Sequence, residues 1–310
     1  QKDTGSGMAI ALGKAVMKLA PILEKSKPDL ILSGFDIAAN FAVTVVGAHM
    51  NIPVAHIQGG EVSGNIDESL RHAMSKFSHY HFAANQDAKK RLIKLGELKS
   101  NIFAVGCPSL DALFSEKNLS RNEVIRKFKI DILKDYILII QHPVTTESKE
   151  SKKQIIEILK ALKKINIQKL FVLPNNDSGA VNIIKVIKKN KVNFTSTLKV
   201  QEYKTLLSNC TMLIGNSSSG IHEAASFFKP VVNIGNRQNG RLKPRNVIDV
   251  ECNTKEILNK INFVLKNKKF VKSLRKLKNP YGDGKSAIKI IKLLKKIRID
   301  KKIIQKKIIY

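Results

Sequence analysis

Short apolar runs alternate with amphipathic stretches along the whole chain. Apolar runs bounded by glycine or polar residues predict buried parallel strands, and the amphipathic stretches predict helices. In the first half the expected strands are residues 29–33, 52–57, 79–83 and 102–105. The helices expected between them are residues 9–25, a segment from residue 38, a segment ending near residue 77, and residues 86–95. This is the rhythm of repeated βαβ units.

The second half restarts the same rhythm after a polar stretch, residues 115–135, in which we expect a short helix and a hinge. Its expected strands are residues 136–141, 169–175, 212–215, 230–234 and 247–250. We therefore predict an α/β fold of two Rossmann-like, doubly wound domains. Two such domains facing each other leave a cleft where the carboxyl ends of both sets of strands meet.

The formal charge of the 310-residue chain is +30, which raises the possibility of nucleic-acid binding. Half of the excess lies in residues 251–310, with 19 basic and 4 acidic side chains, whereas residues 1–110 carry a net charge of only +3. Within residues 251–310, lysines alternate with isoleucine and leucine at helical spacing, so the lysines form solvated helix faces. Tryptophan is absent and aromatic platforms for bases are scarce. We expect no specific nucleic-acid partner, and incidental attraction to polyanions or acidic membrane surfaces as a minor property.

The sequence contains no signal-peptide core and no run of 18 apolar residues, which predicts neither export nor a membrane span. Its three cysteines lie far apart and lack the spacing of a redox or metal motif. We therefore expect a protein of the reducing cytoplasm with buried thiols.

The segment HIQGGEVSGNIDESLRH, residues 56–72, follows an apolar strand and combines a glycine pair with six ionisable side chains. Asn65 is predicted to cap a helix whose first turn carries Asp67 and Glu68. Asp67 and Arg71 are four residues apart, as are Glu68 and His72, so each pair shares a helix face. The segment predicts an acid–base site, and two ordinary surface ion pairs are the alternative.

Further carboxylates are expected near the same sheet edge. Asp36 follows the strand 29–33, and Glu61 follows the glycine pair. Crowding of like charges raises the pKa of some carboxylates and suits them to general acid–base catalysis. His79 and His81 face one side of a strand, but no third ligand has suitable spacing, so we expect no metal and no other cofactor.

In the second half, GNSSSGIHE (215–223) follows an apolar strand and opens a helix, a pattern that suits a pyrophosphate. Glu223 is placed to accept hydrogen bonds from a ribose, although the serines alone would also serve as helix caps. The loop GNRQNGR (235–241) offers Arg237 and Arg241 to an anion, or is a plain turn. His142, Asn176 and Asp177 also follow strands, as ligand contacts or as structural and turn residues.

With these motifs in place, the chain resembles the hydrolysing UDP-N-acetylglucosamine 2-epimerases that feed sialic and related nonulosonic acid synthesis. Five segments occur in family order and spacing: HIQGGEVSGNIDESLRH, QHPVTTE, GNSSSGIHE, the NRQ-G-R loop and NPYGDG (279–284). The resemblance implies the glycosyltransferase B architecture. It gives a sugar-facing domain over residues 1–115, a UDP-binding domain over 116–284, and a C-terminal helix over 285–310 that crosses back toward the first domain.

The implied reaction removes the proton at sugar C2, expels UDP to give a 2-acetamidoglucal, and adds water to release N-acetylmannosamine. By motif match, the expected catalytic residues are Asp36, Glu61, Asp67, Glu68 and His142. The expected substrate- and UDP-binding residues are Arg71, His142, Asn176, Ser217, Ser218, Gly220, Glu223 and Arg241. Base and acid roles stay undivided among the carboxylates. We expect a UDP-sugar substrate and a homo-oligomer, either a dimer or a tetramer.

Three departures from the family pattern stand out. Gln58 replaces a glutamate common in relatives, and it cannot act as a base. Around Asp36 the chain reads SGFD where HGDR is common, which puts Ile37 at the arginine position. The sequence also starts without the family's opening strand and GTR-type loop, so we expect a missing βα unit of roughly 30 residues or more. The alternatives are the same reaction on UDP-2,4-diacetamido-2,4,6-trideoxyglucose, or a catalytically silent UDP-sugar-binding protein.

Overall fold

The computed structural model describes residues 4–34 and 38–309. The chain divides into two compact units. The first unit comprises Gln1–Asp111 and Tyr281–Tyr310, and the second comprises Ala112–Pro280. The C-terminal segment thus packs with the first unit.

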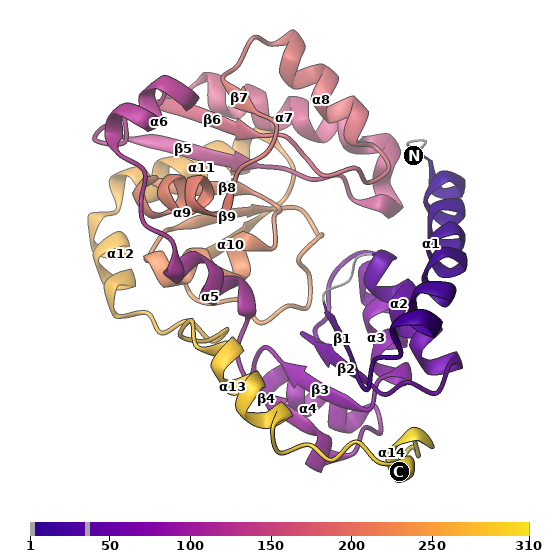
Figure 1. The fold of residues 1–310 in the computed structure, drawn as a ribbon. Helices are drawn as coiled ribbons and strands as arrows, with labels where there is room; N and C mark the ends of the chain where they lie inside the picture. The colour runs from indigo at the N-terminus through magenta and orange to yellow at the C-terminus, as the bar shows by residue number, and fades with distance from the viewer. Residues whose placement is uncertain (1–3, 35–37, 310) are drawn as a thin grey trace. The chain divides into compact units, whose positions relative to one another are not determined.

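The first unit contains a four-stranded parallel sheet in the order β1–β2–β3–β4 (Figure 1). Its strands are β1 (Ile31–Gly34), β2 (Val54–Ile57), β3 (Tyr80–Ala83) and β4 (Ile102–Ala104). Its helices are α1 (Gly5–Ser26), α2 (Ala38–His49), α3 (Asp67–Phe77), α4 (Gln86–Lys94), η1 (Lys99–Asn101), α13 (Ser286–Leu294) and α14 (Lys301–Ile304). Helix α5 (Pro108–Ser115) leads into the second unit.

The second unit contains a six-stranded sheet in the order β10–β9–β8–β5–β6–β7, also parallel throughout. Its strands are β5 (Tyr136–Ile140), β6 (Gln168–Val172), β7 (Phe194–Thr195), β8 (Met212–Gly215), β9 (Val231–Ile234) and β10 (Val247–Val250). Its helices are α6 (Arg121–Phe128), η2 (Thr145–Glu150), α7 (Ser151–Lys163), α8 (Ala180–Lys189), α9 (Val200–Asn209), α10 (Ser219–His222), η3 (Ala224–Phe227), α11 (Thr254–Lys266), α12 (Lys268–Ser273) and η4 (Leu274–Lys276).

Strand β5 shows why this sheet needs helices on both faces. Ile137 and Ile139 belong to the core under α7, α8 and α11, whereas Tyr136, Leu138 and Ile140 belong to the core under α6 and α9 (Figure 1). Successive strand residues point to opposite faces, so an unbroken apolar run requires two covered faces. The sequence of β5 therefore dictates a three-layer arrangement in this unit.

The predicted α/β class with parallel sheets is confirmed. The strands expected over 212–215 and 247–250 have the predicted limits, and the other expected strands are shifted or shortened by a few residues at their ends. Strand β7 was not predicted, because two residues carry no periodicity.

Helix α1 bears on the expectation that the chain has no membrane span. Its 22 residues are long and apolar enough, by length and composition, to cross a membrane, and it is the one such helix in residues 4–34 and 38–309. Lys14 and Lys18 interrupt its apolar residues, so the helix is not an unbroken run of 18 apolar residues. The feature is weak evidence for a span, because soluble core helices and signal sequences pass the same test. In the structure α1 packs against α2 (Figure 1), and Met17 on α1 is 76% exposed.

The start of α13 is fixed by a carboxylate from far back in the chain. Asp111 accepts hydrogen bonds from the backbone N–H groups of Ser286 (2.9 Å) and Ala287 (2.6 Å). These are among the N–H groups that lack partners inside a helix, and a negative charge there also complements the helix dipole. Asp111 thus acts as the N-terminal cap of α13.

We predict that Asp111→Ala lowers the free energy of unfolding by about 1 kcal/mol, the usual cost of losing a helix cap. Chemical denaturation followed by circular dichroism would measure the loss. Asp283→Ala is the matched control, since Asp283 is exposed and pairs across 3.1 Å with Lys289 on the surface. Equal losses in the two variants would contradict a capping role for Asp111.

Candidate active site

The first cluster of candidate residues lies at the carboxyl end of β2, on a loop that has no room for a side chain at Gly59 or Gly60. Gln58 and Gly60 adopt left-handed backbone angles, with φ of 60° and 81°. A Cβ on Gly59 would lie 2.6 Å from Nδ1 of His56, and one on Gly60 would lie 2.5 Å from the Ala88 carbonyl oxygen. The glycine pair is therefore required by close packing against β2 and α4.

Arg71 of α3 holds the far side of this loop. Its side chain is 2% exposed, and Nη1 donates to the Glu61 carbonyl oxygen at 2.9 Å. Glu61 itself is 4% exposed. Arg91 of α4 donates to the Gly60 carbonyl oxygen at 2.8 Å. Two guanidinium groups thus fix consecutive carbonyl groups of the loop, at Gly60 and at the buried Glu61.

Helix α3 starts with a local network instead of the predicted Asn65 cap. The cap position is Ile66, and no side chain bonds the free N–H groups there. The Asn65 amide donates to Asp67 Oδ2 at 2.7 Å, and its oxygen accepts from Ser63 Oγ at 2.9 Å. The prediction that Asn65 caps the helix is wrong, because its side chain is used to orient Asp67.

Glu68 and His72 do share a helix face, as predicted. Their closest nitrogen and oxygen atoms are 3.8 Å apart. Glu68 also accepts a hydrogen bond of 2.7 Å from the Ser63 backbone N–H, so one of its oxygens braces the loop. Partial burial lowers the pKa of His72 although Glu68 opposes the shift. His72 is therefore neutral near pH 7. Asp36 and Ile37, also singled out in the sequence, lie outside the described residues.

The second cluster lies in the second unit, at the point where its strand order reverses. Strand β5 is followed on one side by β6 and β7, and on the other by β8, β9 and β10. Ligands of doubly wound sheets bind outside the carboxyl ends of the two strands at such a reversal. Here those ends carry His142, after β5, and Asn216, after β8.

Asn216 ties the two strand ends together. Its side-chain oxygen accepts from the His142 N–H at 2.7 Å, and its amide nitrogen donates to the His142 carbonyl oxygen at 2.9 Å. Gly215 before it has a φ of 126°, and a Cβ there would lie 2.0 Å from the Ile140 carbonyl oxygen. The sequence analysis missed Asn216 as a site residue, although its place after the strand in GNSSSG is a usable signal.

Nδ1 of the His142 ring faces Asn175. The Asn175 backbone N–H and the Asn175 side-chain oxygen both lie 3.2 Å from it, so Nδ1 is an acceptor in one tautomer and a donor in the other. Burial lowers the pKa of His142 to about 3, and the positive charge of Arg237 contributes in the same direction. His142 is therefore neutral near pH 7. Of the neighbouring candidates, Asn176 is exposed and Asp177 accepts from the Asn175 side chain at 2.6 Å.

The serine segment after β8 forms only one α-helical turn, α10, before η3 begins. Ser217 Oγ accepts from the Ser219 N–H at 3.3 Å, and no side chain caps α10 at Ser218. Gly220 is buried, and a Cβ there would lie 2.9 Å from Val231 Cγ1, so its small size allows α10 to pack on β9. Glu223 lies beside Tyr203. The pKa of the Tyr203 phenol is raised mainly by burial and, as the second cause, by the charge of the Glu223 carboxylate.

The loop after β9 folds back over this segment. Arg237 and Gln238 donate to the Asn216 carbonyl oxygen at 3.3 and 2.8 Å. Arg241 Nη1 lies 2.6 Å from Nε2 of His222, which serves as the acceptor because the guanidinium has only donors. Asn279 of the NPYGDG segment donates to the His222 carbonyl oxygen at 2.7 Å. The NRQ-G-R loop and NPYGDG thus join QHPVTTE in contacting the β8–α10 segment, which is itself the GNSSSGIHE motif.

Among residues 4–34 and 38–309, no group of three or more His, Cys, Asp or Glu side chains is arranged to hold a metal ion. The chemistry available in the described clusters is that of carboxylates and neutral imidazoles beside guanidinium groups.

Comparison with known proteins decides the family. A profile of the UDP-N-acetylglucosamine 2-epimerase family matches residues 1–295. The chain belongs to this family. It is 38% identical over 305 residues to the UDP-N,N'-diacetylbacillosamine 2-epimerase (hydrolyzing) of Legionella pneumophila, an alignment that covers 97% of this chain and 80% of the relative. It is 32% identical to a UDP-N-acetylglucosamine 2-epimerase of Neisseria meningitidis over 83% of this chain and 69% of that one.

Solved structures of epimerases show the same fold. The UDP-N-acetylglucosamine 2-epimerase of Neisseria meningitidis, solved with UDP-GlcNAc, superposes with a TM-score of 0.79 at 21% identity, over 96% of this chain and 84% of that one. The Methanocaldococcus jannaschii enzyme, in complex with UDP-GlcNAc and UDP, also gives 0.79, at 22% identity over 92% and 81%. The predicted two-domain glycosyltransferase B class is confirmed by this likeness.

We predict that Gly60→Ala lowers the free energy of unfolding by about 3 kcal/mol or more, because backbone strain and overpacking add. Gly235→Ala is the matched control: its φ is 75°, but a Cβ there meets nothing within 4 Å. The control should lose only about 1 kcal/mol, the cost of a side chain in the left-handed region. Urea denaturation measures both, and equal losses would mean that the loop relaxes around the new methyl group.

Proposed function

We propose that the protein is a hydrolysing UDP-sugar 2-epimerase, which converts UDP-N-acetylglucosamine and water to N-acetylmannosamine and UDP. The observation that carries the proposal is the cluster of Glu61, Asp67 and Glu68 around one glycine loop, in a chain of this family. Removing a proton from a sugar carbon needs a carboxylate that is held in place; Glu61 lies on the loop, and Asp67 and Glu68 lie in the first turn of α3 that follows it.

The proposed chemistry has two stages. In the first, a carboxylate takes the C2 proton, the C1–O bond to UDP breaks, and a C1=C2 double bond forms in a 2-acetamidoglucal. In the second, a base takes one proton from water as the water oxygen bonds to C1, while an acid delivers a proton to C2 on the face opposite to the one that lost its proton, which gives the manno configuration. General acid–base groups of this kind contribute about 10²- to 10⁴-fold each.

Among the carboxylates, we assign proton transfer to Glu61 and Asp67. One Glu68 oxygen already accepts from the Ser63 N–H, so Glu68 supports the loop. Asp67 is half-buried and is oriented by Asn65. Arg71 holds Glu61 in position by donating a hydrogen bond to the Glu61 carbonyl oxygen. Asp36, which the family resemblance also suggests, joins the proposal as a further candidate.

The second unit is proposed to bind UDP. Its support is the strand-order reversal at His142 and Asn216, with arginines 237 and 241 beside the serine segment. His142 is neutral, and in the tautomer that accepts from the Asn175 N–H its Nε2 carries the proton and is a hydrogen-bond donor for a phosphate oxygen. Ser217, Ser218, Arg241 and Asn176 are proposed as further contacts, and Glu223 as the acceptor for the ribose hydroxyls.

A second substrate has specific support. The Legionella pneumophila relative, 38% identical to this chain, is named for UDP-N,N'-diacetylbacillosamine. That sugar carries an acetamido group at C4 and lacks the 6-hydroxyl, but it presents the same C1, C2 and UDP groups to the proposed chemistry. The two substrates must therefore be tested side by side.

Proton NMR in D2O tests the proposal, with each UDP-sugar incubated separately with the purified protein. The expected products are free UDP and an N-acetylmannosamine-type sugar that carries deuterium at C2. Turnover of the diacetamido sugar alone would assign the second substrate. UDP-N-acetylmannosamine without release of UDP would contradict hydrolysis. Saturable UDP binding with no turnover of either sugar would make the protein a silent UDP-sugar binder.

We predict that Asp67→Asn lowers kcat by about 10²-fold or more while the Kd for UDP stays within about twofold, because the amide cannot take or give the proton. Release of UDP measures kcat, and isothermal titration measures binding. Asp283→Asn is the control and should keep full activity, since its carboxylate lies on the surface. Normal turnover by Asp67→Asn would make Asp67 a structural residue.

A further inference from the structure

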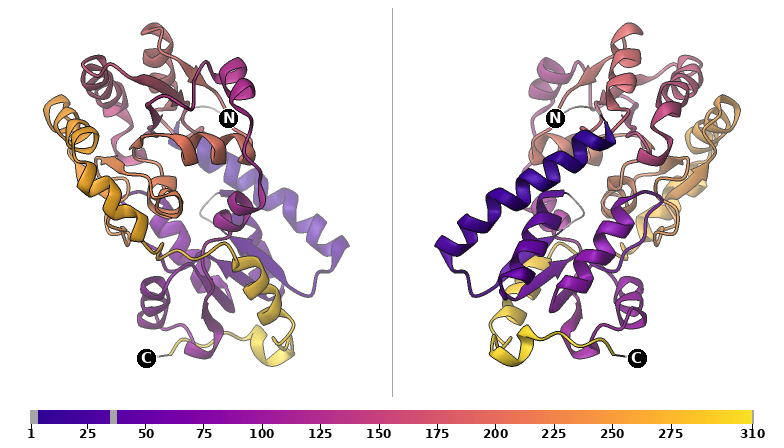
Figure 2. Two further views of the ribbon diagram at one scale, coloured as in Figure 1. Left: turned by 90° about the vertical axis from the view of Figure 1, so that its left-hand side faces the viewer. Right: turned by 90° about the vertical axis from the view of Figure 1, so that its right-hand side faces the viewer.

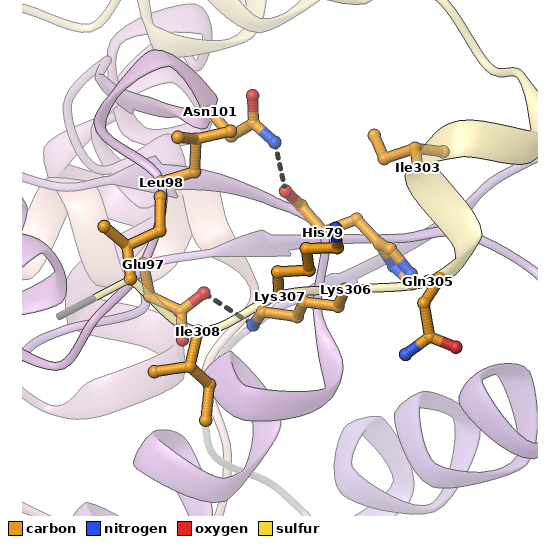
Figure 3. A pocket seen from close by; sticks show the side chains of 10 residues that line it. His79, Glu97, Leu98, Asn101, Ile303, Gln305, Lys306, Lys307 and Ile308 are labelled. Atoms are coloured by element: carbon orange, nitrogen blue, oxygen red, sulfur yellow. Dashed lines mark hydrogen bonds and ion pairs between the residues drawn. The ribbon is translucent and has the colours of Figure 1, made fainter.

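The C-terminal segment that follows α13 is attached to the first unit at several points. Tyr80 donates from its hydroxyl to the Arg298 carbonyl oxygen at 3.0 Å, and the Ile309 N–H donates to Gly96 at 3.1 Å. The Val54 N–H donates to Nδ1 of His79, so Nε2 of that ring carries the proton and donates to the Ile304 carbonyl oxygen at 3.3 Å. Figures 1 and 2 show the segment running past α4, and Figure 3 shows the cavity of about 750 Å³ that it lines.

Lys306 is the charged contact of this segment. Its ammonium donates to the Ser75 carbonyl oxygen at 2.7 Å, to the Lys76 carbonyl oxygen at 3.0 Å, and to Glu97 Oε2 at 2.5 Å (Figure 3). All three of its hydrogens are used. Ser75 and Lys76 lie in the last turn of α3, where carbonyls lack intrahelical partners and a cation complements the helix dipole. Lys306 therefore caps the carboxyl end of α3.

Glu97 connects this cap to the sheet. Its side chain is 1% exposed, and it contacts Lys76 at 3.2 Å and Nε2 of His81 at 2.9 Å as well as Lys306. Burial raises the pKa of Glu97, but hydrogen bonds from His81 and Lys306 outweigh it and lower the pKa to about 2. A carboxylate this deeply buried stays ionised only while its donors remain in place.

Ser75 connects the last turn of α3 to the glycine loop. Its hydroxyl donates to the Arg71 carbonyl oxygen at 3.1 Å, and so it accepts from Nδ1 of His56 at 3.1 Å. His56 precedes the loop, and a Cβ on Gly59 would lie 2.6 Å from its Nδ1 and 3.0 Å from Ser75 Oγ. The loop thus rests directly on the His56–Ser75 pair, and the next turn of α3 carries Arg71.

We propose that Lys306 is a positioning residue for the carboxylates of the glycine loop: by fixing the last turn of α3 and Glu97, it holds His56, Gly59 and Arg71 in register, and through them Glu61 and Asp67. The kinetic part of this proposal rests on the proposed function. Lys306 touches no reacting atom and acts only through α3 and the loop. Motif matching could not find it, because it lies outside all five family segments.

The test compares Lys306→Met with Lys306→Arg and with a control variant, Lys307→Met. Lys307 is the next residue in the chain, and its side chain is exposed. Hydrogen–deuterium exchange followed by mass spectrometry is the readout that does not need activity. We expect amides of residues 56–77 to exchange about tenfold faster in Lys306→Met, less so in Lys306→Arg, and unchanged in Lys307→Met. We also expect kcat to fall about tenfold with KM within twofold, since misplacement affects the reaction more than binding.

Unchanged exchange over residues 56–77 in a folded Lys306→Met variant would overturn the proposal, as would an equal rise across the whole first unit. If Lys306→Met does not fold, Lys306→Arg decides. A guanidinium keeps the charge but cannot reproduce three convergent contacts, so local exchange should still rise, and no rise would overturn the proposal. Faster local exchange in a protein that turns over neither UDP-sugar would refute the proposed function and leave the positioning role intact.

Discussion

The structure depends on parallel strands that are buried on both faces. Such strands satisfy their own backbone groups along their length, but at their carboxyl ends the last N–H and C=O groups need other partners. This protein supplies those partners from side chains that follow the strands, as Asn216 does for His142 and as the arginines of α3 and α4 do for Gly60 and Glu61. The groups that satisfy the sheet edge are thus the same groups that define the candidate site.

This dual use explains which parts of the structure could be predicted. The limits of β8 and β10 follow from apolar runs with clear boundaries. The grouping of Glu61, Asp67 and Glu68 follows from their closeness in sequence to one strand end. The Asn65 cap was wrong because a residue near a helix start has several partners within reach, and Asp67 and Ser63 competed successfully for its side chain.

Contacts across long sequence separations could not be predicted. The Asp111 cap of α13 joins residues 175 and 176 positions apart, and the Lys306 cap of α3 joins residues about 230 positions apart. Neither has a local periodicity, and each depends on how the C-terminal segment packs with the first unit. Asp111 and Glu97 thus have structural roles. Composition alone does not distinguish these two carboxylates from the proposed catalytic ones.

The buried histidines have a consequence for the whole molecule. Five of them have a pKa below the usual value near 6.5, with burial as the largest cause in each: His56, His72, His79, His81 and His142. Unfolding exposes these rings, so below about pH 6.5 the unfolded chain takes up protons that the folded chain refuses, and the free energy of unfolding falls as the pH drops. The stabilisation from Glu97, whose folded pKa is about 2, is lost only at much lower pH. Mild acid therefore weakens this fold first through its imidazoles.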